Sequence, residues 1–157
     1  MKIKNIIDED FTNYKKPSMF IAFPYCTFKC DRECGKPICQ NSDLAYAPNI
    51  EIETGIIIQR YLNNPITSAL VLGGLEPFDS FGDMVSLIYQ FRLECDDDII
   101  IYTGYVEDEI FTQVIMLKEF KNIIIKFGRY IPNSNKHYSN LLGIELASDN
   151  QYAVKIS

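Results

Sequence analysis

Four of the five cysteines of this chain lie within one short stretch, FPYCTFKCDRECGKPICQN, at residues 23–41. Basic residues are interleaved with these thiols, and nearby positive charge favours the thiolate form that binds metals. Thiols gathered this closely are costly to keep apart from a metal or from one another, so we expect them either to bind a metal or to pair as disulfides. The four cysteines are Cys26, Cys30, Cys34 and Cys39.

The spacing of these cysteines separates the possible chemistries. Structural zinc sites usually use two short cysteine pairs far apart in sequence, whereas here all four lie in one run, so zinc stays open but fits poorly. Disulfides fit least, because the cysteine count is odd and the N-terminus MKIKNIIDEDFTNY does not resemble an export signal. An iron–sulfur cluster uses several thiolates from one loop, so we interpret residues 24–42 as a cluster loop. With only three cysteine ligands, one iron would stay open for a substrate.

Length and charge limit the number of domains and the classes of partner that this chain can have. With 157 residues, 47% of them hydrophobic, the sequence predicts a single domain, 1–157. The net charge of −6 argues against a nucleic-acid binder, and no apolar run reaches membrane-spanning length. We expect a soluble, cytoplasmic protein that binds neither nucleic acid nor membrane.

Apolar runs and amphipathic stretches alternate along the chain, which predicts an α/β fold with a largely parallel sheet. Residues 8–17, 42–49 and 128–140 look irregular, and the tail, 141–156, predicts one or two more strands. We expect an edge strand at 2–7, buried strands at 18–23, 68–72, 98–102 and 122–127, and helices at 51–62, 80–94 and 107–120.

Two segments at strand ends carry candidate ligand-binding groups. Gly73 and Gly74 allow a close backbone approach, and the carboxylate of Glu76 can accept hydrogen bonds from an ammonium group. Thr103 offers a hydroxyl, followed by Gly104, although an ordinary turn explains this pair about as well. Ligands of open parallel sheets bind at the carboxyl ends of the strands, where both segments lie.

Several of these motifs resemble radical S-adenosylmethionine (SAM) enzymes. Cys26-x3-Cys30 follows an apolar strand, and Cys39-Gln40-Asn41 resembles the end of that family's cluster loop. The resemblance implies a partial, open (β/α) barrel, a [4Fe-4S] cluster and SAM as cosubstrate. It is strongest to the small activating proteins of anaerobic ribonucleotide reductases and related glycyl radical enzyme activases.

The chain departs from the family pattern in the cluster loop. The usual third cysteine follows two intervening residues, but eight residues separate Cys30 from Cys39, and Cys34 lies among them. Cys26, Cys30 and Cys39 are our preferred ligands, because the Cys-polar-Asn ending matches at Cys39. Cys34 remains the alternative third ligand.

Three further motifs match the family. Gly73-Gly74-Leu75-Glu76-Pro77 resembles its Gly-Gly-Glu-Pro motif at the methionine end of SAM, with Leu75 inserted. Tyr102-Thr103-Gly104-Tyr105 resembles a stretch facing the cosubstrate. The tail motif, residues 148–151, is similar to the Ser-Asn-Gln tail of the reductase-activating branch. By resemblance, Gly73, Gly74, Glu76, Thr103 and Gly104 bind the cofactor.

The implied function is reductive cleavage of SAM to a 5′-deoxyadenosyl radical, which takes a hydrogen atom from a glycine of a partner enzyme. The implied partners are a glycyl radical enzyme, such as an anaerobic ribonucleotide reductase, and a flavodoxin- or ferredoxin-type electron donor. Two alternatives stay open: a radical SAM enzyme acting on another peptide or a small metabolite, and a non-catalytic iron–sulfur or zinc module.

Overall fold

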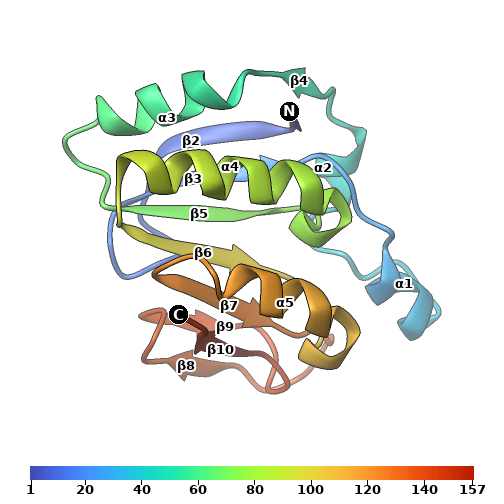
Figure 1. Cartoon of the computed structure of the whole chain (residues 1–157). Helices are drawn as coiled ribbons and strands as arrows, with labels where there is room; N and C mark the ends of the chain where they lie inside the picture. Colours follow the sequence, from blue (N-terminus) through green and yellow to red (C-terminus); the bar gives the residue numbers. More distant parts are fainter.

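The protein is an α/β structure built on a six-stranded mixed sheet (Figure 1). The computed structural model describes residues 1–157. Four central strands are parallel and one antiparallel strand lies at each edge, in the order β10-β7-β6-β5-β3-β2. Their bounds are β2, Asn5–Asp10; β3, Ser18–Phe23; β5, Ala69–Gly74; β6, Asp98–Tyr102; β7, Ile123–Phe127; and β10, Tyr152–Lys155.

Each central strand supplies side chains to two hydrophobic layers. In β6, Ile99 and Ile101 pack in the larger core and Ile100 in the smaller one on the opposite face. In β5, Leu70 packs in the larger core and Val71 in the smaller one. Successive strand residues point to opposite faces, and here both faces are covered. The strands are therefore apolar throughout rather than alternating.

Helices cover one face of the sheet (Figure 1). Their buried residues, for example Tyr61, Phe91 and Leu117, join the larger core with one face of the strands. Full burial of one large apolar side chain stabilises a fold by roughly 1.5–3 kcal/mol. The three helices are α3, Thr54–Leu62; α4, Phe81–Glu94; and α5, Phe111–Leu117.

The opposite face is covered by irregular chain and a small hairpin. Tyr14, Leu142 and Leu146 pack there against the smaller core. The Tyr102 hydroxyl donates to the carbonyl of Asn13 at 2.5 Å, which ties the segment after β2 to the end of β6. The hairpin consists of β8, His137–Ser139, and β9, Ile144–Leu146.

Short elements lie at the side toward which the parallel strands point (Figure 1). They include a helix within the cluster loop and a helix that begins at the loop's last residue, neither with a buried residue. These elements are α1, Lys29–Cys34; α2, Ser42–Tyr46; and the 3-10 helices η1, Pro77–Ser80, and η2, Glu107–Ile110. A two-stranded sheet pairs β1, Lys2–Ile3, with β4, Ile50–Glu51.

The four predicted buried strands are confirmed, as is the α/β class with a mostly parallel sheet. The sheet is open, with β10 and β2 at its edges, and does not close into a barrel. No helix is long and apolar enough to cross a membrane.

Three segments expected to be irregular contain regular structure. The first edge strand is interrupted and continues to Asp10, α2 lies within 42–49, and β8 lies within 128–140. The helix expected at 51–62 begins only at Thr54, because β4 precedes it. The pairing partner of β4 is β1, which is distant in sequence, so local patterns did not reveal β4.

We predict that Gly74→Ala destabilises the fold. Gly74 has φ 84°, and an added Cβ would lie 2.7 Å from Cα of Ala22 in the neighbouring strand. We expect a loss of about 1–3 kcal/mol in the free energy of unfolding, measured by urea denaturation of the metal-free protein.

Gly55→Ala is the matched control. Gly55 lies in α3, and an added Cβ there meets no atom within 4 Å. Removing a helical glycine should stabilise the protein by about 0.5–1 kcal/mol. Equal effects of the two substitutions would contradict a role for the β3–β5 contact.

Candidate functional site

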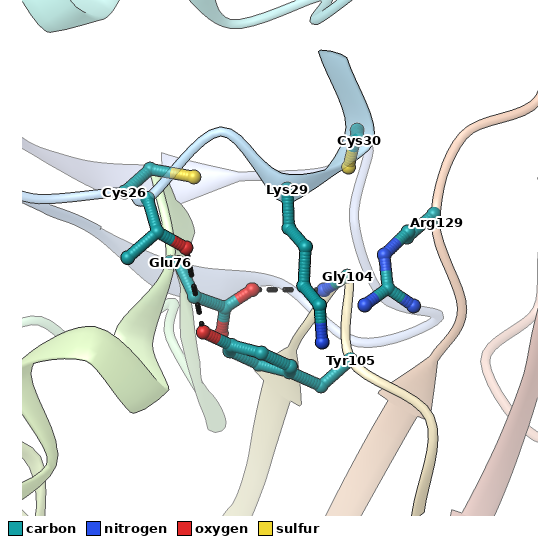
Figure 2. Close-up of a pocket in the computed structure, with 8 residues that line it drawn as sticks. Cys26, Lys29, Cys30, Glu76, Gly104, Tyr105 and Arg129 are labelled. Atoms are coloured by element: carbon teal, nitrogen blue, oxygen red, sulfur yellow. Dashed lines mark hydrogen bonds between the residues drawn. The ribbon is translucent and has the colours of Figure 1, made fainter. Parts of the chain in front are cut away.

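A pocket opens where the cluster loop meets the ends of the parallel strands (Figure 2). Residues from the loop, from the ends of β5 and β6, and from the segment after β7 surround it. Ligands of open parallel sheets bind at this end. Its lining is Cys26, Thr27, Lys29, Cys30, Glu76, Gly104, Tyr105 and Arg129.

The cluster loop is fastened to the segment after β5 at both of its ends. Near its start, the backbone N–H of Glu76 donates to the carbonyl of Tyr25 at 2.8 Å. At its end, the side-chain amide of Asn41 donates to the carbonyl of Gly74 at 2.8 Å. The two motifs predicted from the sequence are therefore in direct contact.

Asp79 of η1 adds a third attachment. One of its carboxylate oxygens accepts the N–H of Thr27 and the other accepts the Tyr105 hydroxyl, both at 2.7 Å. Burial first, and then the bond to Asp79, raise the pKa of Tyr105 to about 12. The sequence gave no reason to assign Asp79, because the contacts come from segments 52 and 26 residues away.

Two of the four loop cysteines line the pocket, and a third acts on both electrostatically. Cys26 and Cys30 both line the pocket. Burial raises the pKa of Cys26 to about 12 and also raises that of Cys30, and the negative charge of a Cys39 thiolate adds to both increases. Cys34 is exposed at the end of α1. Cys39 thus lies within electrostatic reach of both pocket thiols.

All five cysteines are free thiols. No three His, Cys, Asp or Glu side chains lie close enough together to hold a single metal ion. Cys95, the fifth cysteine, is near Arg92 and Asp97 and is remote from the loop cysteines in sequence.

Glu76 is buried, and its carboxylate accepts three hydrogen bonds. One carboxylate oxygen accepts the Thr103 hydroxyl at 2.8 Å and the N–H of Phe78 at 3.1 Å, and the other accepts the N–H of Gly104 at 2.9 Å. Burial raises its pKa to about 7, against the lowering effect of these donors. The structure brings Glu76, Thr103 and Gly104 together, and Oε2 of Glu76, which accepts a single hydrogen bond, retains one free acceptor position in a residue that lines the pocket.

The three predicted glycines have different surroundings. An added Cβ at Gly73 would meet the Phe20 ring at 3.0 Å, and Gly74 lies against Ala22, so both allow close packing within the sheet. At Gly104, an added Cβ would lie 3.5 Å from the Cys30 sulfur. Gly104 is the glycine whose missing side chain makes room beside a cysteine.

A charged network surrounds the mouth of the pocket. Glu109 of η2 accepts hydrogen bonds from Arg129 at 2.7 and 2.8 Å and also binds Lys29. Arg129 also pairs with Glu33 of α1 at 3.1 Å. The Lys29 ammonium lies 5.4 Å from the centre of the Tyr105 ring. These ion pairs fasten α1 to the ends of β6 and β7.

Sequence reasoning missed Arg129, Lys29 and Glu109. Arg129 could have been found, because Gly128 and Arg129 directly follow β7 and therefore lie at the same sheet edge as the other motifs. Glu109 looked like an ordinary acidic residue in the first turn of a helix.

The tail motif supports the segment that carries Arg129. The Asn150 amide donates to the carbonyl of Arg129 at 3.0 Å, and the Gln151 amide donates to that of Gly128 at 3.2 Å. The Ser148 hydroxyl accepts the N–H of Ile131 at 2.8 Å. This motif, noted above only for its resemblance, has a physical role in positioning residues 128–131.

The donor chemistry of the loop fits an iron–sulfur cluster. Three free thiols share one end of the sheet, a glycine leaves space beside one of them, and two cations lie close by. Comparison with known proteins agrees: a family model described as a 4Fe-4S single cluster domain matches residues 17–151. No curated protein and no solved structure matches the chain.

We predict that Glu109→Gln removes an acid-sensitive part of the stability. Partial burial alone would raise the pKa of Glu109, but its bonds to Arg129 and then Lys29 outweigh burial and lower the pKa to about 2. The ionised carboxylate therefore contributes stability above about pH 4.5, and this contribution is lost as the pH falls toward 2.

The measurement is denaturant unfolding of metal-free wild type and variant between pH 7 and 2. We expect a difference on the order of 1 kcal/mol at neutral pH that disappears at the acid end. Asp108→Asn, at a neighbouring residue that makes no ion pair, is the control. A difference that does not change with pH would contradict the proposed network.

Proposed function

Since the chain belongs to the family of 4Fe-4S single cluster domains, it is an iron–sulfur protein, and we propose that it is a radical SAM enzyme. In this proposal Cys26, Cys30 and Cys39 hold the [4Fe-4S] cluster and leave one iron open for SAM. The reduced cluster supplies the electron that cleaves SAM to methionine and a 5′-deoxyadenosyl radical. A partial, open barrel of the radical SAM type is the corresponding description of the fold.

The observation that carries this proposal is the meeting of the cluster loop with two strand-end motifs at one pocket. Glu76 and Gly104 line the same pocket as Cys26 and Cys30. A purely structural cluster needs only its cysteines at the pocket, and it does not require that a carboxylate with a free acceptor position and a glycine line the same pocket. A site that also binds a small polar cosubstrate uses all of them.

The protein's own residues have definite tasks in this proposal. Glu76 holds Thr103 and Gly104 in place, and the free acceptor position of its Oε2 would be available to an amino group. Lys29 and Arg129 place positive charge beside the thiolates and so offset their mutual repulsion. Gly73 and Gly74 keep β3 and β5 close enough for both motifs to meet.

A protein is the substrate that best suits this site. Neither α1 nor α2 has a buried residue, so the cluster loop lies at the molecular surface. A site near the surface can receive a loop of another protein, whereas small metabolites are usually enclosed. We propose a glycyl radical enzyme of the anaerobic ribonucleotide reductase type as substrate, with a flavodoxin- or ferredoxin-type electron donor.

A second candidate function is electron transfer by a cluster with four cysteine ligands. Cys30 and Cys34 lie one turn apart on α1, a spacing that places two side chains on one helix face. Four thiolates would leave no iron open for a cosubstrate.

Electron paramagnetic resonance of the reconstituted, reduced protein tests the proposal. We expect a [4Fe-4S]⁺ signal that changes shape when SAM is added, because SAM binds directly to the open iron. A cluster signal indifferent to SAM would support the electron-transfer candidate and overturn the radical mechanism. A protein that holds zinc and shows no signal would overturn both.

Substitution of single cysteines tests the ligand set. Cys39→Ala should abolish SAM cleavage, whereas Cys34→Ala should leave most of it, as measured by release of 5′-deoxyadenosine. Cys95→Ala, remote from the loop, is the control and should leave cleavage unchanged. The reverse behaviour of the first two variants would assign Cys34 as the third ligand.

A further inference from the structure

The eight residues between Cys30 and Cys39 are closed by a single side chain. Asp31 directly follows Cys30 on α1, and its Oδ1 atom accepts the backbone N–H groups of Ile38 and Cys39, both at 2.9 Å. Hydrogen bonds to an ionised carboxylate are among the stronger ones in proteins. One carboxylate oxygen thus brings the two ends of the inserted segment, residues 31–38, together.

Little else holds the second half of this segment. The chain reverses direction after α1 at Gly35, which has φ 69°. No hydrogen bond from any side chain other than Asp31 reaches residues 35–39. Because α1 has no buried residue, packing in the core does not fix the segment either.

The closed segment ends at Cys39, directly before residues 41–42, which are held in position by other hydrogen bonds. The Cys39 carbonyl accepts the N–H of Ser42 at 3.3 Å, and Asn41 reaches Gly74. The position of Cys39 is therefore fixed by Asp31 on one side and by the Asn41–Gly74 bond on the other. Cys34 has no comparable link, is exposed and does not line the pocket.

We propose that Asp31 is a positioning residue that closes the inserted segment and thereby makes Cys39, rather than Cys34, the third cysteine of the cluster loop. The inference rests on the ligand set of the proposed function. It explains how a loop with a longer spacing can still present three thiols to one cluster: the insertion is bridged at its base, so the thiols on either side of it stay close.

The first test measures how fast single variants of the reconstituted protein lose iron. Asp31→Ala removes the acceptor, and we expect iron release from the reconstituted protein to an anaerobic chelator to be about 10–100-fold faster, the usual effect of losing an outer-shell partner. Asp31→Asn keeps a side-chain oxygen that can accept both N–H groups, and should restore most of the wild-type behaviour.

Asp43→Ala is the matched control. Asp43 is an exposed acidic residue of α2, directly after the cluster loop, and its side chain makes no hydrogen bond. Iron release should match the wild type. The thermal unfolding midpoint of the metal-free protein should be nearly the same for wild type, Asp31→Ala and Asp43→Ala, since none of these side chains is part of the core. A large fall in that midpoint for Asp31→Ala alone would indicate a general structural role and overturn the inference.

A second test asks which cysteine the cluster uses. In the wild-type background, Cys34→Ala should leave the iron content unchanged. With Asp31→Ala also present, Cys39 is no longer held and Cys34 can compete, so the double variant should lose iron that Asp31→Ala alone retains. Additive effects of the two substitutions, or wild-type lability of Asp31→Ala, would overturn the inference.

The failure of this inference can be told apart from the failure of the ligand set. If Cys39→Ala keeps a full complement of iron, the ligand set is wrong and the inference falls with it. If Cys39→Ala loses iron while Asp31→Ala behaves as the wild type, the ligand set stands and only the role of Asp31 is overturned.

Discussion

The hydrogen bonds of Glu76 join the elements that make the site. Its carboxylate binds Thr103 and Gly104 after β6, and its backbone N–H binds Tyr25 at the start of the cluster loop. A carboxylate this deeply buried is costly to leave unpaired, so its partners are strongly held. Three strand ends, β3, β5 and β6, are therefore locked in one arrangement, and the loop and pocket depend on it.

The charged network extends this arrangement outward. Glu109 binds Lys29 and Arg129, and Arg129 pairs with Glu33, so α1 is connected to the ends of β6 and β7 although it buries no residue. Side chains that lie on the surface thus fix a loop that the hydrophobic core does not reach. The tail motif contributes because the Asn150 side chain binds the backbone carbonyl of Arg129. The segment before β10 therefore supports a residue whose side chain pairs with the cluster loop.

A hydrophobic core for the sheet and polar bonds for the loop suit a protein that binds a cluster. The sheet is rigid because both faces of its strands are covered by apolar side chains. The loop is attached by a few polar bonds at defined points, of which those of Asn41 and Asp79 are the clearest, and Asp31 closes the segment inserted within it. A loop attached in this way can close around a cluster without disturbing the core, and its long insertion is accommodated at the surface, where added chain is tolerated well.

The sequence by itself determined the four buried strands, the alternation with helices and the single cysteine-rich loop. Each of these depends on local patterns: continuous apolar runs bounded by polar segments, and thiols close together along the chain. It also placed Glu76 and Gly104 at strand ends. Only the tertiary structure decided that Glu76 binds Gly104, that Arg129 and Glu109 join the site, and that Asp31 reaches Cys39. These contacts connect segments 8–28 residues apart and depend on backbone direction, which no local pattern specifies.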